Sequence, residues 1–204
     1  AWKLQGDILL YGQNKSEEAL AVYGKSTEVD PKFGPGHIAA LTVLMRQGKF
    51  DEATKQLEQL KGLAANSPQT KYFEAQLAYQ KKDYKLARDL IQQLLPLSPN
   101  DPRILQLAGA VEFRMNSFVQ AETYLTRATQ MAPDFAPARG LLIATYLRSG
   151  QAARALAALN AIEGKGALPP AMFVLAGEVH LQNGDAKRAE EYFAKALKLD
   201  PENA

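Results

Sequence analysis

The most constraining feature of this sequence is an alanine that recurs every 34 residues without slippage. The six alanines are Ala19, Ala53, Ala87, Ala121, Ala155 and Ala189. A fixed period of roughly 20–50 residues is the mark of a repeat architecture, in which each copy buries its apolar face only by stacking on its neighbours. The sequence therefore predicts one small structural unit repeated six times.

Other residues repeat in step with the alanines. Four residues after each alanine stands a large apolar side chain, in the order Tyr23, Leu57, Ile91, Leu125, Leu159 and Phe193. Five residues before it stand Asn14, Gly48, Lys82, Asn116, Gly150 and Gly184, which are mostly types that tolerate a left-handed backbone. Twelve residues after it, prolines that end a helix fill four of the six slots, at Pro31, Pro99, Pro133 and Pro201. Each copy is thus predicted to be a helix, a tight turn, a second helix and a stop.

This pattern resembles the tetratricopeptide repeat (TPR). The last copy shows it most clearly, in Phe173, Ala176, Gly177, His180, Gly184, Ala189, Phe193, Ala196 and Pro201. The resemblance implies an all-α fold, a right-handed α-solenoid of six 34-residue helix–turn–helix repeats that forms a single array over residues 1–204. The expected repeats are about 1–33, 34–67, 68–101, 102–135, 136–169 and 170–204. Two departures are mild: the first copy has one extra residue, expected in its turn around 12–14, and the third has Lys82 where Gly or Asn is usual.

Periodicity and stop signals together predict twelve helices. The first helices of the pairs are expected near 2–12, 35–47, 68–81, 101–115, 135–148 and 170–182. Their partners are expected near 16–29, 50–61, 84–95, 118–131, 152–162 and 186–199. Small residues on the first helices, namely Ala75, Gly109 and Gly177, are expected to let the paired helices approach closely.

Composition excludes several classes of function. A net charge of +2 gives no support for nucleic-acid binding, and no apolar run is long enough for a membrane span. The chain has no cysteine, and its two histidines, His37 and His180, lie in different repeats. Gly24-Lys25-Ser26 lacks the leading glycine of a phosphate-binding loop and falls inside a predicted helix. We therefore expect no enzyme activity, no metal and no cofactor.

The resemblance implies that a concave face, lined by positions two, five, nine, twelve and thirteen of each first helix, binds the partner. The candidate groove residues at these positions are Arg46, Tyr72, Gln76, Tyr79, Gln80, Arg103, Gln106, Phe113, Arg114 and Arg148. Arginine and tyrosine are enriched in binding hot spots, and no acid stands at these positions before Glu178 in the sixth repeat. An alternative interpretation is that the arginines merely offset the dipoles at helix ends. Family members that clamp chaperone tails need Lys and Asn four residues apart on a first helix, and no first helix here has that pair.

Two stretches, 36–63 and 135–162, are similar to the TPR lipoproteins of bacterial PEP-CTERM and exopolysaccharide systems. That likeness implies a periplasmic or outer-membrane-associated protein, with a cytoplasmic location as the alternative. The chain starts without Met, and its end repeats resemble the internal ones. We therefore expect a fragment of a longer solenoid, with further repeats on either side and a lipid anchor upstream.

The leading functional hypothesis is an interaction scaffold that holds an extended peptide or protein partner in its concave groove. The alternative is direct binding of an anionic polysaccharide along the same groove. A third hypothesis, an accessory domain of an enzyme, would need catalytic residues outside this segment. Peptide and glycan titrations would separate the first two.

Overall fold

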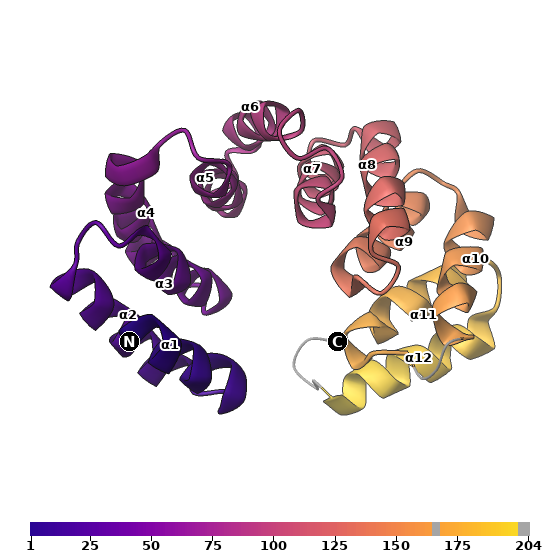
Figure 1. The fold of residues 1–204 in the computed structure, drawn as a ribbon. Helices are drawn as coiled ribbons and strands as arrows, with labels where there is room; N and C mark the ends of the chain where they lie inside the picture. Colours follow the sequence, from indigo (N-terminus) through magenta and orange to yellow (C-terminus); the bar gives the residue numbers. More distant parts are fainter. Residues whose placement is uncertain (165–167, 200–204) are drawn as a thin grey trace. The chain divides into compact units, whose positions relative to one another are not determined.

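The computed structural model describes residues 1–164 and 168–199, and over these residues the chain is helical with no β-strand (Figure 1). The described residues form twelve α-helices, arranged in sequence as six pairs joined by short turns. The predicted all-α fold of helix–turn–helix repeats is therefore confirmed. The stop predicted at Pro201 lies outside the described residues.

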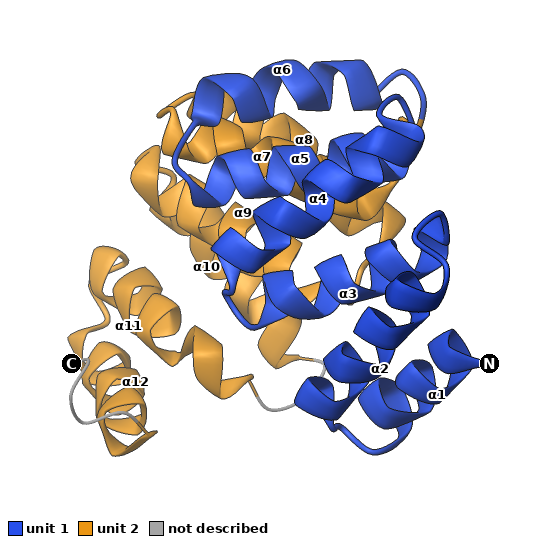
Figure 2. Cartoon of the chain, turned by 90° about the vertical axis from the view of Figure 1, so that its left-hand side faces the viewer, with its two compact units in different colours: residues 1–97 blue, residues 98–204 orange. Residues whose placement is uncertain are grey.

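The chain divides into two compact units, residues 1–97 and residues 98–204 (Figure 2). Each unit contains three helix pairs, α1 to α6 in the first and α7 to α12 in the second. The boundary falls after the last helix of the third predicted repeat. That the two units continue one array over the whole chain stays a prediction.

The helices of unit 1 begin and end close to the predicted residues. They are α1 (Trp2–Asp7), which continues into a π-helical turn η1 (Ile8–Gly12), α2 (Ser16–Val29), α3 (Gly34–Arg46), α4 (Phe50–Ala64), α5 (Pro68–Gln80) and α6 (Tyr84–Leu94). Proline stands in the first turn of α3 and of α5, where its missing N–H has no intrahelical partner to lose. Ser67 caps α5 by accepting a hydrogen bond from the backbone N–H of Thr70.

Unit 2 follows the same plan. Its helices are α7 (Pro102–Arg114), α8 (Phe118–Met131), α9 (Ala136–Arg148), α10 (Ala152–Glu163), α11 (Phe173–Gln182) and α12 (Ala186–Leu199). The predicted helix 170–182 differs at its start, because Pro170–Met172 forms a 3₁₀ turn, η2, before α11 begins. Asp101 caps α7 by accepting a hydrogen bond from the backbone N–H of Arg103.

The turn inside each pair reverses the chain through one residue with a left-handed backbone. These six residues are Asn14, Gly48, Lys82, Asn116, Gly150 and Gly184, with φ between 54° and 82°. They occupy the six positions at which the sequence predicts such a residue. Lys82, the departure from Gly or Asn, adopts the same conformation with φ 64°, so the fold imposes the turn on a residue that does not favour it.

Close approach of the paired helices depends on small residues facing large ones. Ala121 on α8 is fully buried, and Gly109 on α7 lies against Leu125, so that a Cβ added at Gly109 would be 2.4 Å from the Leu125 Cγ. Gly177 faces Phe193 in the same way, with a Cβ distance of 2.4 Å to the ring. In the first, fourth and sixth repeats, the large residue four positions after the repeated alanine thus fills the space left by a glycine on the partner helix.

The extra residue of the first repeat is absorbed in a helix and not in the turn. Gly6 faces Tyr23 as Gly109 faces Leu125, but it lies one residue further from its repeated alanine than the equivalent glycines do. The π-helical turn Ile8–Gly12 between Gly6 and Asn14 accommodates this residue. Our expectation of a longer turn around 12–14 was therefore wrong. A single-residue insertion inside a helix is typically taken up as one π turn, which keeps both flanking contacts in register.

In unit 1, apolar clusters join neighbouring repeats. In unit 1, Leu57 and Leu60 of α4 pack in one cluster with Phe73 and Leu77 of α5. Tyr23 belongs to a second cluster, which reaches the next repeat through residues of α3. Burying these side chains against both neighbours is what stabilises stacked repeats, since no single pair can cover its own apolar face.

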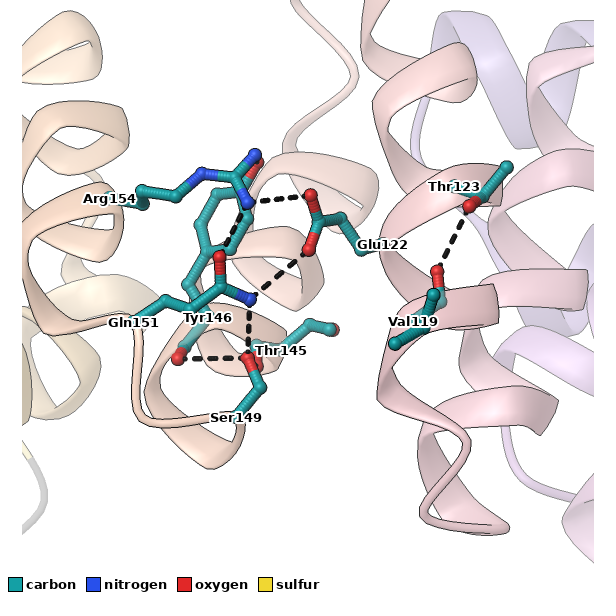
Figure 3. A network of polar contacts seen from close by, with 8 residues as sticks. All are labelled: Val119, Glu122, Thr123, Thr145, Tyr146, Ser149, Gln151 and Arg154. Carbon is teal, nitrogen blue, oxygen red and sulfur yellow. Dashed lines mark hydrogen bonds and ion pairs between the residues drawn. The ribbon is translucent and has the colours of Figure 1, made fainter.

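A polar network also joins the fourth and fifth repeats (Figure 3). Glu122 of α8 forms an ion pair of 2.7 Å with Arg154 of α10 and accepts a hydrogen bond of 3.2 Å from Gln151. The Arg154 guanidinium lies 4.3 Å from the centre of the Tyr146 ring and donates to its hydroxyl. These charges are committed to contacts between repeats and are poorly suited to bind a partner.

Candidate functional site

In unit 1, the candidate groove residues divide into exposed helix ends and half-buried side chains. Arg46, the last residue of α3, and Gln80, the last of α5, are exposed. Tyr72, Gln76 and Tyr79 are half-buried on α5. The Gln76 Nε2 donates to the Tyr72 hydroxyl at 3.2 Å, which shows that positions five and nine share one face of the helix.

In unit 2, the candidates are exposed except for Gln106 and Phe113, which are half-buried on α7. Arg114 and Arg148 are the last residues of α7 and α9, where a cation also offsets the helix dipole. The Phe113 ring lies edge-on to the Phe118 ring, with 5.8 Å between centroids. Phe118 thereby holds Phe113 in a fixed orientation at the end of the helix.

Arg103 is engaged with its own helix cap. It forms an ion pair of 2.6 Å with Asp101, and its Nε donates to the same carboxylate at 3.1 Å. The hydrogen bond from Arg103 is the main reason that the pKa of Asp101 lies below its ordinary value, with burial opposing it. Arg103 therefore completes the start of α7, and a ligand would have to compete with Asp101 for it.

The structure brings Phe113 and Arg148 together at a cavity in unit 2. The cavity has a volume of about 390 Å³ and lies between three first helices, α7, α9 and α11. Its lining residues are Phe113, Ala144, Leu147, Arg148, Glu178, Leu181 and Gln182. We call this the groove cavity. It is built from positions nine, twelve and thirteen of consecutive first helices, so the positional rule that selected the candidates also predicts this surface.

The candidate set omits five of the seven residues that line the groove cavity, namely Ala144, Leu147, Glu178, Leu181 and Gln182. Ala144 stands at position nine of the fifth repeat, and Leu147, Leu181 and Gln182 stand at positions twelve and thirteen of their repeats. Glu178 was set aside as an exception, yet it lines the same cavity as Arg148. The groove cavity therefore carries both signs of charge beside apolar walls from Leu147 and Leu181. Arg103, Gln106 and Arg114 do not line it.

Both histidines are buried and packed. The His37 Nε2 donates to the carbonyl of Pro31 at 2.8 Å, and its Nδ1 accepts a hydrogen bond from Gln56. The His180 ring stacks on the Tyr192 ring at 5.6 Å with an interplanar angle of 5°. Both rings are thus part of the packing between paired helices.

Among residues 1–164 and 168–199, no group of three or more His, Cys, Asp or Glu side chains is placed to hold a metal ion. No helix over the same residues is both long and apolar enough to cross a bilayer.

Three sequence profiles described as tetratricopeptide repeat match the chain, at residues 38–102, 113–172 and 173–203. The chain is also 23% identical over 198 residues to the anaphase-promoting complex subunit CDC16 of Saccharomyces cerevisiae, a match that covers 94% of this chain and 24% of that protein. The chain therefore spans about a quarter of the length of that curated relative.

Solved structures show the same fold. The crystal structure of the APC/C hetero-tetramer Cut9-Hcn1 has a TM-score of 0.88 at 22% identity, covering 99% of this chain and 40% of that one. The crystal structure of PilW, a widely conserved type IV pilus biogenesis factor, has a TM-score of 0.84 at 19% identity, covering 100% and 93%. Six helix pairs with a left-handed residue in each turn, three matching profiles and these structural neighbours lead to one conclusion: the chain belongs to the tetratricopeptide-repeat family.

Proposed function

We propose that this protein holds an extended peptide or protein partner against its first helices, with the groove cavity as a principal anchoring point. The observation that carries the proposal is the clustering of Phe113, Leu147, Arg148 and Leu181 around one cavity on three consecutive first helices. Aromatic and apolar anchors beside an exposed arginine are the composition of a binding hot spot. A TPR scaffold for protein interactions is the general role of the family, and the groove gives that role a specific surface.

The mixed charge of the groove cavity favours a peptide over the alternative, an anionic polysaccharide. A polyanion binds more tightly to a continuous row of cations, but the Glu178 carboxylate beside Arg148 would repel it. A peptide can present an acidic group to Arg148, a basic or amide group to Glu178 and an apolar side chain between Leu147 and Leu181. The expected ligand is therefore an extended peptide with both polar signs around an apolar residue.

For the setting, we propose the bacterial envelope, in a system for exopolysaccharide production or protein sorting. Support comes from the resemblance of residues 36–63 and 135–162 to TPR lipoproteins of such systems. The packed histidines and the lack of a nucleophile–base pair in the sequence support a scaffold without its own catalytic activity.

The test starts from a random-peptide phage library selected on the wild-type chain. The peptides obtained are then titrated by fluorescence anisotropy against Arg148→Glu and against Lys187→Glu, which makes the same charge change on the exposed face of α12. We expect the groove variant to lose about tenfold or more in affinity, since losing a charged contact typically removes at least ~1.4 kcal/mol. The Lys187 variant should bind as wild type does.

The same titrations separate the two functions. Alginate serves as the anionic polysaccharide probe, at matched ionic strength because exposed charges are screened by salt. Binding of alginate without binding of any selected peptide would favour the polysaccharide function. Loss of peptide binding in Lys187→Glu with retention in Arg148→Glu would overturn the groove assignment.

A further inference from the structure

The second helix of the fifth repeat lacks the large side chains that every other repeat carries at two positions facing the first helix. The first-helix residue in question lies four positions before the site that carries Gly6, Gly109 and Gly177 in the first, fourth and sixth repeats. Across the six repeats it is Trp2, His37, Lys71, Leu105, Arg139 and Phe173. The second helix can cover it with two residues, the third and the sixth after the repeated alanine, which we call the cover positions. In the third repeat, for example, Lys71 donates a hydrogen bond of 2.8 Å to Gln93 at a cover position.

In the first, second and sixth repeats, a side chain at a cover position contacts the equivalent first-helix residue through other types of interaction. Lys25 lies 5.8 Å from the centre of the Trp2 ring, and Gln56 bonds to His37. In the sixth repeat, the ring of Tyr192 lies 6.0 Å from that of Phe173, and Lys195 lies over Phe173 as well. The cover positions outside the fifth repeat all carry side chains of valine size or larger, namely Val22, Lys25, Gln56, Gln59, Leu90, Gln93, Tyr124, Arg127, Tyr192 and Lys195.

In the fifth repeat, both cover positions are alanine, at Ala158 and Ala161. The space they leave is a cavity of about 220 Å³ between α8, α9 and α10, which we call the Arg139 cavity. Its lining residues are Thr129, Pro133, Arg139, Leu142, Ile143, Ala158, Ala161 and Ile162. It shares no residue with the groove cavity.

The chemistry of this cavity is one cation among apolar walls. Within the described residues, the Nε of Arg139 is buried and has no hydrogen-bond partner. Thr129, the other polar side chain at the cavity, already donates its hydroxyl hydrogen to the Thr126 carbonyl at 2.9 Å. A guanidinium stays charged at all accessible pH values and prefers carboxylate oxygens, which accept two parallel N–H bonds. The occupant that satisfies this site carries a carboxylate on an apolar body.

Size narrows the class of ligand. A volume of 220 Å³ lies below the ~300–1,000 Å³ of typical small-molecule sites, so the occupant is a small molecule and not a nucleotide or a large cofactor. We propose that the Arg139 cavity binds a small monocarboxylate with an apolar body, such as an aryl or short alkyl carboxylic acid. The carboxylate pairs with the Arg139 guanidinium, and the hydrocarbon occupies the space that the missing side chains at Ala158 and Ala161 leave open. This proposal does not depend on the groove.

The test is a titration of the ¹⁵N-labelled full chain with 3-phenylpropionate and with its neutral amide, followed by amide chemical shifts. The acid should shift resonances of α9 and α10, and the neutral amide should bind at least about tenfold more weakly because it lacks the charge. Ala158→Leu, which restores the residue of the third repeat, should fill the cavity and reduce binding by about tenfold or more. Ala157→Leu, on the exposed side of the same helix, is the matched control and should bind as wild type does.

Two further variants test the role of the Arg139 charge and guard against loss of folding. Arg139→Gln should remove the preference for the acid over the amide. If Ala158→Leu melts below the wild type, Ala161→Gln at an exposed cover position replaces it as the cavity-filling variant. Absence of α9 and α10 shifts up to about 10 mM acid, equal binding by acid and amide, or unchanged binding in the folded cavity-filling variant would each overturn the proposal.

Discussion

Gly109→Ala tests the physical basis of helix pairing in this fold. The added Cβ would lie 2.4 Å from the Leu125 Cγ and 2.7 Å from its Cδ2, roughly 1 Å inside ordinary contact. Leu125 is fully buried, so its side chain has no solvent-exposed face towards which to turn. Overpacking of this kind typically costs ~1–3 kcal/mol, while replacing a helical glycine with alanine returns up to ~1 kcal/mol. We expect the free energy of unfolding to fall by about 1–2 kcal/mol.

The matched control is Gly140→Ala, the same change on α9 in the same unit. A Cβ at Gly140 would meet nothing within 4 Å, so only the helix-propensity gain remains. This variant should be more stable than wild type by about 0.5–1 kcal/mol. Identical chemistry thus has opposite predicted signs at the two sites, which removes any common effect of the substitution on the unfolded chain.

Both variants are measured by urea unfolding followed by circular dichroism at 222 nm, with the slopes compared to confirm that the exposed surface is unchanged. A second readout is the double variant Gly109→Ala with Leu125→Ala. Its destabilisation should be smaller than the sum of the single changes by about 1 kcal/mol, because the truncated leucine no longer clashes. If Gly109→Ala and Gly140→Ala shift stability in the same direction, the close-approach explanation of the glycines is wrong.

Three further predictions concern the turns, the alanine row and acid stability. Lys82→Gly should raise the free energy of unfolding by about 1 kcal/mol in urea titrations, because glycine has no steric penalty at φ 64°. Ala121→Leu should lower the melting temperature through overpacking of about 1–3 kcal/mol, whereas Gln120→Leu at the neighbouring exposed position should be nearly neutral; equal melting of the two would contradict the assigned helix face. The lowered pKa of Asp101 means that its interaction stabilises the fold above the unfolded pKa of about 4 and is lost as pH falls through the folded value. In Asp101→Asn, the free energy of unfolding should therefore fall less on acidification than it does in wild type. The difference should be under about 1 kcal/mol, because the Arg103 side chain is exposed to solvent. An unchanged pH profile would show that the Asp101–Arg103 pair contributes nothing to stability.

The candidate site was predictable only in part. The rule of first-helix positions selected Phe113 and Arg148, which the structure places at one cavity. It also selected Arg103, which the structure ties to Asp101 at the start of α7. A positional rule identifies the helix face on which a side chain lies, but not whether that side chain already forms an ion pair with a neighbour. The sequence indicates the Arg139 cavity only through Ala158 and Ala161, which stand where the other repeats have larger residues. The volume of the cavity and the burial of the Arg139 Nε follow only from the packed helices.

The sequence alone determined the repeat period, the paired helices and the six left-handed turn residues, because these depend on local backbone preferences and on spacing within one short segment. Tertiary structure decided the backbone conformation at two places where it departs from local preference. Lys82 adopts a left-handed turn against its own preference, since the paired helices on either side must reverse direction there. The extra residue of the first repeat becomes a π turn, and Gly6 keeps its contact with Tyr23. Packing between helices outweighs the local preference in both cases, because many buried contacts depend on register and only one residue bears the strain.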